Sequence, residues 1–130
     1  MNPRVLLVDD HEDARTTLVE RLRRDEGLEL VGAAASVEEA AQLLSAARPD
    51  IVLLDIHGHD GHGLDACRAL RQLSDAPVVV FTSFLTGELW SAASAAGAAD
   101  YILKHIDTDR LSREIVRLAE RHGRRTPAPS

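Results

Sequence analysis

The chain has 130 residues, with 15 lysines and arginines against 21 aspartates and glutamates, for a formal net charge of −6. This length suits one domain that can bury enough surface to fold without disulfides or metals. The single cysteine, Cys67, excludes a disulfide-rich secreted scaffold. The sequence has no apolar run long enough for a membrane span and no signal-peptide core, and its acidic balance argues against binding nucleic acid by charge. We therefore expect a soluble, cytoplasmic protein with no membrane partner.

Apolar runs of strand length alternate with stretches of helical periodicity. In chain order, the expected strands cover residues 4–8, 28–34, 51–54, 78–81 and 101–103, and the helices about 13–25, 36–47, 64–73, 88–96 and 107–122. Ser36 and Glu39 form a capping-box pattern, Pro49 stops that helix, and Gly97 suits a left-handed helix end. Several strands are apolar on both faces, as a parallel sheet between helices requires. The alternation predicts an α/β fold with an open, doubly wound sheet.

The composition changes after Gly123. Residues 124–130 contain arginines and prolines and have no apolar face. We therefore expect one domain over residues 1–122, followed by a tail or the start of an interdomain linker over residues 123–130.

Polar side chains follow the expected strands at their carboxyl ends, where open parallel sheets gather functional residues. These residues are Asp9, Asp10, Asp55, Thr82, Ser83 and Lys104. Three carboxylates at one edge repel each other, and a divalent cation with oxygen ligands, such as Mg²⁺, would join them. The hydroxyl and the ammonium are suited to hold phosphoryl oxygens, and Asp55 is the candidate nucleophile.

Each of these residues also has an ordinary structural interpretation. Asp9 and Asp10 can begin a helix and complement its dipole. Thr82 alone would be a strand-end residue, and Lys104 alone a surface residue. The combination is more specific than any member. Lys104 is also the only lysine among the 15 cationic side chains, so a bias towards arginine does not explain this position.

Four segments in this order resemble the receiver domain of bacterial two-component response regulators. They are VLLVDDH at 5–11, IVLLD at 51–55, VFTS at 80–83 and GAADYILK at 97–104. The resemblance covers residues 4 to about 122 and is strongest to the branch that carries a C-terminal helix-turn-helix DNA-binding domain. It implies a flavodoxin-like (βα)5 fold with a five-stranded parallel sheet in the order 2-1-3-4-5.

The resemblance implies roles for the acidic residues. Asp55 matches the phosphoacceptor, which becomes an acyl phosphate. Asp10 matches the carboxylate that binds Mg²⁺ directly, and Asp9 its neighbour that usually acts through water. The main-chain carbonyl of His57 matches the third protein ligand. The implied metal site therefore contains Asp9, Asp10, Asp55 and His57.

The resemblance also implies a switch. Thr82 matches the hydroxyl that moves towards the phosphoryl group, and Lys104 the cation that pairs with it. Tyr101 matches the aromatic whose rotamer reports phosphorylation, on the face made by the fourth helix, the fifth strand and the fifth helix. The implied function is a signalling switch and not a classical enzyme, although it catalyses its own phosphorylation and dephosphorylation.

The implied partners follow from the same resemblance. A sensor histidine kinase would supply the phosphoryl group, and phosphorylation would produce a homodimer or release an effector. DNA would be contacted only through an effector domain that this chain does not contain, in the regulation of transcription. The alternative is an atypical receiver-like interaction module that works without phosphorylation. A dinucleotide enzyme is not supported, because no glycine-rich loop follows the first strand.

Two histidines depart from the family pattern. Most receivers have proline at the positions of His59 and His105. A cis bond before a residue other than proline costs about 3 to 4 kcal/mol, so we expect a trans bond between Lys104 and His105. The spacing of His57, His59 and His62 could bind Zn²⁺ or Ni²⁺, or these imidazoles could simply face water on a glycine-rich loop.

Two hydrophobic side chains remain outside this pattern. Trp90 is either an exposed anchor for a partner or a packing residue on the fourth helix. Cys67 is expected to act as a small buried hydrophobe.

Overall fold

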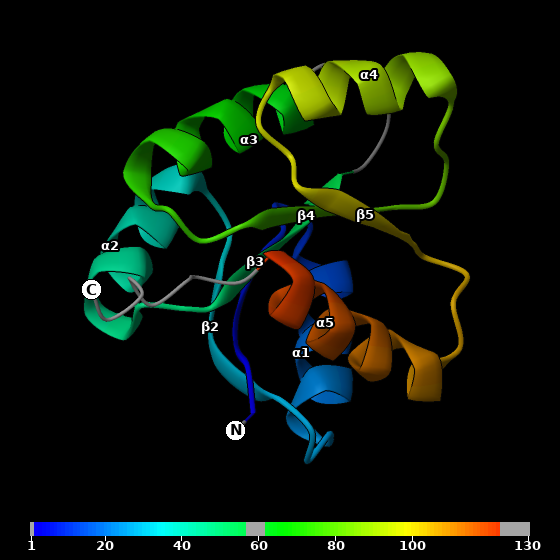
Figure 1. The fold of residues 1–130 in the computed structure, drawn as a ribbon. Coiled ribbons are helices and arrows are strands. Elements are labelled where there is room, and N and C mark those ends of the chain that lie inside the picture. Colours follow the sequence, from blue (N-terminus) through cyan, green and yellow to red (C-terminus); the bar gives the residue numbers. More distant parts are fainter. Residues whose placement is uncertain (1, 57–61, 123–130) are drawn as a thin grey trace, which may run out of the picture.

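A computed structural model of the protein describes residues 2–56 and 62–122, where strands and helices alternate (Figure 1). The strands are β1 (Arg4–Val8), β2 (Glu29–Ala34), β3 (Ile51–Ile56), β4 (Val78–Thr82) and β5 (Asp100–Leu103). The helices are α1 (Glu12–Arg23), α2 (Val37–Ala47), α3 (His62–Leu73), α4 (Gly87–Ala95) and α5 (Thr108–His122). Every expected element is present.

The strands form one five-stranded parallel sheet in the order β2-β1-β3-β4-β5, which confirms the doubly wound fold and the implied strand order. Three strands are longer than the sequence predicted: β5 begins one residue early, at Asp100, and β3 and β4 end later. β3 continues through Asp55 and β4 through Thr82, because the parallel ladder still pairs Asp55 with Phe81 and Ile56 with Thr82. Both candidate polar residues therefore lie inside strands and share the rigidity of the sheet.

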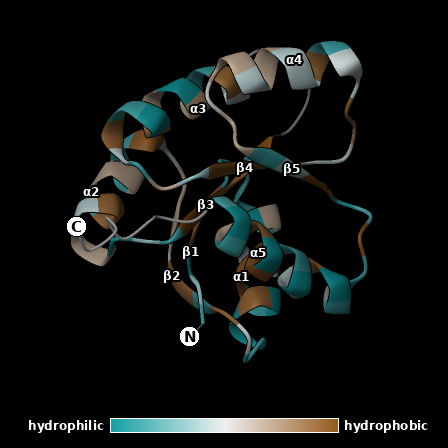
Figure 2. Ribbon diagram, viewed as in Figure 1, coloured by the Kyte–Doolittle hydropathy of each residue, from teal (hydrophilic) through white to brown (hydrophobic). Residues whose placement is uncertain are grey.

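Helices cover both faces of the sheet: α1 and α5 lie on one face, and α2, α3 and α4 on the other (Figure 1). Because side chains alternate along a strand, β3 sends Ile51 and Leu53 towards α1 and α5, and Val52 and Leu54 towards the opposite helices. The hydrophobic sides of the helices face the sheet in Figure 2. The central strands are thus buried on both faces, as their apolar runs predicted.

The two faces are packed by side chains of different size. The α1/α5 face contains the large buried residues Leu18, Leu22, Leu111, Ile115 and Leu118. The opposite face also has large buried residues. However, α3, α4 and the segments that follow them contribute several small buried side chains, namely Cys67, Ala76, Ala93, Ala96 and Ala98. Cys67 is fully buried, which confirms its expected role, and burial raises the pKa of its thiol.

Local signals fix several helix ends as predicted. The Ser36 hydroxyl accepts a hydrogen bond from the Glu39 N–H at 3.2 Å, and the Glu39 carboxylate accepts one from the Ala35 N–H at 2.9 Å. Gly97 has φ of +106°, where a side chain would also strike Arg71. Helix α1 is an exception, because it ends at Arg23 and not at the predicted Asp25, whose side chain accepts a hydrogen bond from the Gly27 N–H in the following turn.

The Lys104–His105 peptide bond is trans, as expected, because the described residues contain no cis peptide. His57 and His59 lie outside the described residues, as does the side chain of His62, so the histidine loop stays a prediction. Over residues 2–56 and 62–122, no helix combines the length and the apolar character that crossing a bilayer requires.

Candidate functional site

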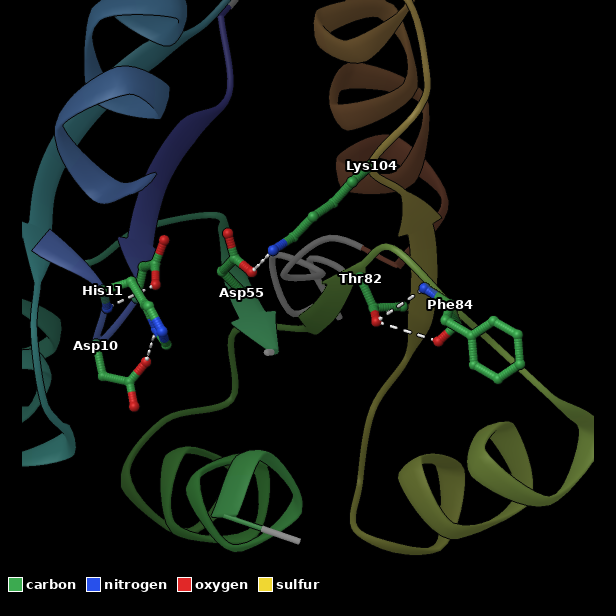
Figure 3. A network of polar contacts seen from close by, with 7 residues as sticks. Asp10, His11, Asp55, Thr82, Phe84 and Lys104 are labelled. Atoms are coloured by element: carbon green, nitrogen blue, oxygen red, sulfur yellow. Dashed lines mark hydrogen bonds and ion pairs between the residues drawn. The ribbon is translucent and has the colours of Figure 1, made fainter. Parts of the chain in front are cut away.

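The carboxyl ends of β1, β3 and β5 bring Asp9, Asp55 and Lys104 to one edge of the sheet. Figure 3 shows Asp55 and Lys104 turned towards each other at this edge. Main-chain hydrogen bonds continue the ladders into these residues. The Asp9 N–H donates to the Ala34 carbonyl at 3.0 Å, and the Lys104 N–H donates to the Thr82 carbonyl at 2.8 Å. The backbone of each residue is therefore fixed by the sheet and not by a loose loop.

Asp55 and Lys104 form an ion pair between Oδ1 and Nζ (Figure 3). The Asp55 side chain is 3% exposed and the Lys104 side chain 20% exposed, so bulk water and salt screen this pair weakly. The sequence predicted both residues at the strand ends, and the structure brings their charged groups into contact.

Asp9, Asp10 and His11 form the acidic end of the site. Their potential ligand atoms all lie within 4.8 Å of one another. The His11 N–H donates to Asp9 Oδ1 at 3.0 Å, and His11 Nδ1 lies 3.0 Å from Asp10 Oδ1. Asp9 is almost fully buried, whereas Asp10 and His11 are exposed. The position of His11 directly after Asp10 in the sequence is the signal that places it in this cluster.

The carboxylates of Asp9, Asp10 and Asp55 line one cavity of about 270 Å³. It lies between the strand ends and the first turns of α2 and α3. Asp9 is a buried carboxylate at its wall, Asp10 is exposed to water, and Asp55 is held by Lys104. Carboxylate oxygens with space for water suit the octahedral coordination of Mg²⁺, so these side chains could hold that ion. The main chain of His57, the remaining predicted ligand, lies outside the described residues.

Thr82 is turned towards the next loop. Its hydroxyl donates to the Phe84 carbonyl at 3.2 Å and accepts from the Phe84 N–H at 3.4 Å, while the Phe84 ring points outward (Figure 3). Strand alternation places Thr82 on the same face as Val80, towards α3 and α4, whereas Asp55 shares the parity of Leu53. Thr82 therefore lies at the same edge of the sheet as Asp55, and its hydroxyl is hydrogen-bonded to the main chain of Phe84.

Tyr101 and Trp90 connect β5 to α4. Their ring centroids are 5.3 Å apart with an interplanar angle of 57°. Tyr101 is 38% exposed, and Trp90 is partly buried against the hydrophobic cluster of this face. Trp90 therefore acts as a packing residue. A tilted aromatic pair of this kind contributes about 1 kcal/mol beyond its buried area.

A shallow hollow of about 400 Å³ runs along β5 and α5 beside this aromatic pair. Its rim is charged. Arg117 forms an ion pair with Glu114, and hydrogen bonding to this guanidinium lowers the pKa of the Glu114 carboxyl. His122 Nε2 lies 3.0 Å from Asp100 Oδ2 and joins the end of α5 to β5.

Comparison with known proteins gives a consistent result. The chain matches the family model of the response regulator receiver domain over residues 5–116. It is 41% identical over 113 residues to the DNA-binding transcriptional activator DevR/DosR of Mycobacterium tuberculosis, covering 86% of this chain and 52% of that protein. The chain spans about half the length of the curated relatives it matches.

Solved structures of response regulators share the fold. A two-component response regulator of the LuxR family from Aurantimonas sp. SI85-9A1 aligns with a TM-score of 0.79 and 30% identity over 98% of this chain and 91% of that chain. The signal receiver domain of the putative response regulator NarL from Mycobacterium tuberculosis aligns with a TM-score of 0.76 and 26% identity, over 92% of this chain and 97% of that one.

Proposed function

Because this chain belongs to the response regulator receiver domains of two-component systems, we propose that it is switched by phosphorylation of Asp55. Receiver domains are signalling switches and not classical enzymes. The observation that supports Asp55 is its buried ion pair with Lys104, at a cavity that Asp9 and Asp10 also line. Replacing a buried ion pair by apolar residues of similar volume is often neutral or stabilising, so the stability of the fold does not by itself account for this pair.

The proposed step is a phosphoryl transfer onto the Asp55 carboxylate. One carboxylate oxygen attacks the phosphorus of a phosphohistidine on a sensor histidine kinase, or of a small donor such as acetyl phosphate. The new P–O bond forms as the P–N bond, or the P–O bond to acetate, breaks, and the leaving group takes the bonding electron pair. Lys104 is already in place to attract a phosphoryl oxygen. Attack by water on the same phosphorus reverses the switch and releases inorganic phosphate.

Asp9, Asp10 and Asp55 would hold Mg²⁺, together with the main-chain carbonyl of His57. The buried Asp9 carboxylate and the exposed Asp10 carboxylate supply oxygen donors, with the rest of the cavity available to water. When bound, Mg²⁺ neutralises negative charge on the transferred phosphoryl group. Positioning and electrostatics then provide most of the catalysis.

The proposed output begins at Thr82. Its hydroxyl would leave the main chain of Phe84 for a phosphoryl oxygen, which changes the loop before α4 and the packing of Tyr101 against Trp90. The surface of α4, β5 and α5 would then form a homodimer or release an effector. We place the receiver in residues 1–122 and the start of a linker in residues 123–130. DevR/DosR is named as a DNA-binding activator, and by analogy DNA would be bound by an effector domain beyond this chain, in the cytoplasm.

The test is intact-mass measurement after incubation with acetyl phosphate and Mg²⁺. The wild type should gain one phosphoryl group, and Asp55→Asn should gain none. Asp65→Asn is the matched control, because Asp65 is an exposed carboxylate on α3 paired with Arg68. Removal of Mg²⁺ with a chelator should abolish the gain.

No phosphoryl gain in the wild type, or an equal gain in Asp55→Asn, would contradict the proposal. The first of these results would instead support a receiver-like interaction module that works without phosphorylation.

A further inference from the structure

We propose that Phe81 is a positioning residue for this reaction, and that its ring holds the Lys104 ammonium beside Asp55 by a cation–π interaction. The inference rests on the proposed phosphorylation of Asp55. This role gives a reason for the buried aromatic side chain next to the charged groups of the site.

Sheet register places Phe81 at the centre of the site. It lies level with Asp55 on β3 and with Ile102 on β5. Alternation directs Asp55, Phe81 and Ile102 to the α1/α5 face, and Lys104, two residues after Ile102, follows the same parity. The ladder therefore sets carboxylate, ring and ammonium on one face of three neighbouring strands.

The contacts agree with this register. Lys104 Nζ lies over the Phe81 ring, 5.8 Å from its centroid, while it pairs with Asp55 Oδ1. Phe81 is 4% exposed. All three residues line a cavity of about 340 Å³ that Ala14 and Thr17 of α1 also border. An ammonium over the face of a ring is attracted by the ring quadrupole, and more strongly where water is excluded.

The ring supplies an attraction that phosphorylation does not remove. Before the transfer, Lys104 is held by the negative carboxylate. When an Asp55 oxygen becomes the bridging oxygen of the acyl phosphate, its charge passes to the phosphoryl oxygens, and the ammonium must follow. Lysine has a long, flexible stem that loses entropy when it is fixed. A ring that attracts the ammonium in both states keeps it within reach of the site.

A purely structural role for Phe81 would depend on its shape, whereas this role depends on the electrons of its ring. Fluorine substitution separates the two, because successive ring fluorines weaken the quadrupole while the shape changes little. The chain has only two phenylalanines. In a Phe84→Leu background, every fluorinated phenylalanine supplied during expression enters at Phe81.

The first measurement is the rate constant of phosphorylation by acetyl phosphate with Mg²⁺. It should fall stepwise with the number of fluorines, reaching a loss of about fivefold for the most fluorinated ring. The matched control is Phe81→Leu with Phe84 retained, in which fluorination of the exposed Phe84 ring should leave the rate constant unchanged. Denaturant unfolding of each protein tests whether the fold is retained.

The second measurement needs no phosphodonor. Because Lys104 is the only lysine, lysine labelled with ¹³C at the ε-carbon gives one side-chain NMR signal. The relaxation of this signal should show a more mobile side chain as fluorines are added. A rate constant and a mobility that are both constant across the series would overturn the inference. If no protein in the series is phosphorylated, the proposed function fails, and the NMR signal still decides whether the ring holds the ammonium.

Discussion

The two faces of the sheet carry different parts of the candidate switch. On the α1/α5 face, Asp55 forms an ion pair with Lys104, whose ammonium lies over the Phe81 ring. The two helices on this face pack against the sheet with large aliphatic side chains. On the opposite face, Thr82 engages the loop before α4, and α4 itself contributes the fully buried but small Ala93. Strand alternation separates the two sets, because neighbouring residues of one strand point to opposite faces.

In the proposed switch α4 moves while the reaction site stays in place, and the difference in packing between the two faces supports this proposal. A buried alanine removes much less apolar surface from water than a buried leucine, so displacing α4 costs less than displacing α5. Trp90 and Tyr101 give α4 its aromatic contact with β5, and this contact lies at a partly exposed surface. Regions that move in switches are drawn from the less stable parts of a fold.

The largest expected effect is on the free energy of unfolding, when one buried side chain is truncated on each face of the sheet. Leu118→Ala removes a fully buried side chain of α5 and should lower the free energy of unfolding by about 3 kcal/mol. Ala93→Gly, at the buried side of α4, should lower it by about 1 kcal/mol. Urea denaturation measures both. Equal losses, or a larger loss for Ala93→Gly, would show that α4 is attached as firmly as α5.

A smaller effect concerns the outer surface of α5, where Glu114 pairs with Arg117. Because the pKa of the Glu114 carboxyl is lowered in the folded state, the pair stabilises the protein above the unfolded pKa, and this contribution is lost as the pH falls through the folded pKa. The stability difference between wild type and Glu114→Gln should therefore be small and should shrink between about pH 6 and about pH 3. A difference that is independent of pH would exclude this ion pair as its source.

The sequence predicted much of the fold because its signals were local. The capping box at Ser36, the left-handed end at Gly97 and the apolar central strands each depend on nearby residues, and all were confirmed. The predicted ends of β3 and β4 were less accurate. Asp55 and Thr82 look like strand ends by their polarity, but pairing with a neighbouring strand continues the ladder through them.

The candidate site was only partly accessible to the same reasoning. The sequence order predicted that Asp55 and Lys104 would converge, because carboxyl ends of parallel strands share an edge. It could not identify Phe81, which looks like any other residue of an apolar run until the register sets it level with Asp55. The contact of the Thr82 hydroxyl with Phe84 was equally inaccessible, since it depends on the path of a loop.

The proposed switch transmits phosphoryl transfer from one face of the sheet to the other through Thr82. Trp90 is the only tryptophan of the chain and lies against Tyr101, so its fluorescence reports on α4 and β5. The decisive measurement is Trp90 emission after addition of acetyl phosphate and Mg²⁺, with intact mass recorded on the same samples. Thr16→Ala, at an exposed threonine of α1, serves as the control. We predict that wild type and Thr16→Ala are phosphorylated with a change in emission, whereas Thr82→Ala is phosphorylated without one. A full change in phosphorylated Thr82→Ala, or none in phosphorylated wild type, would contradict the account.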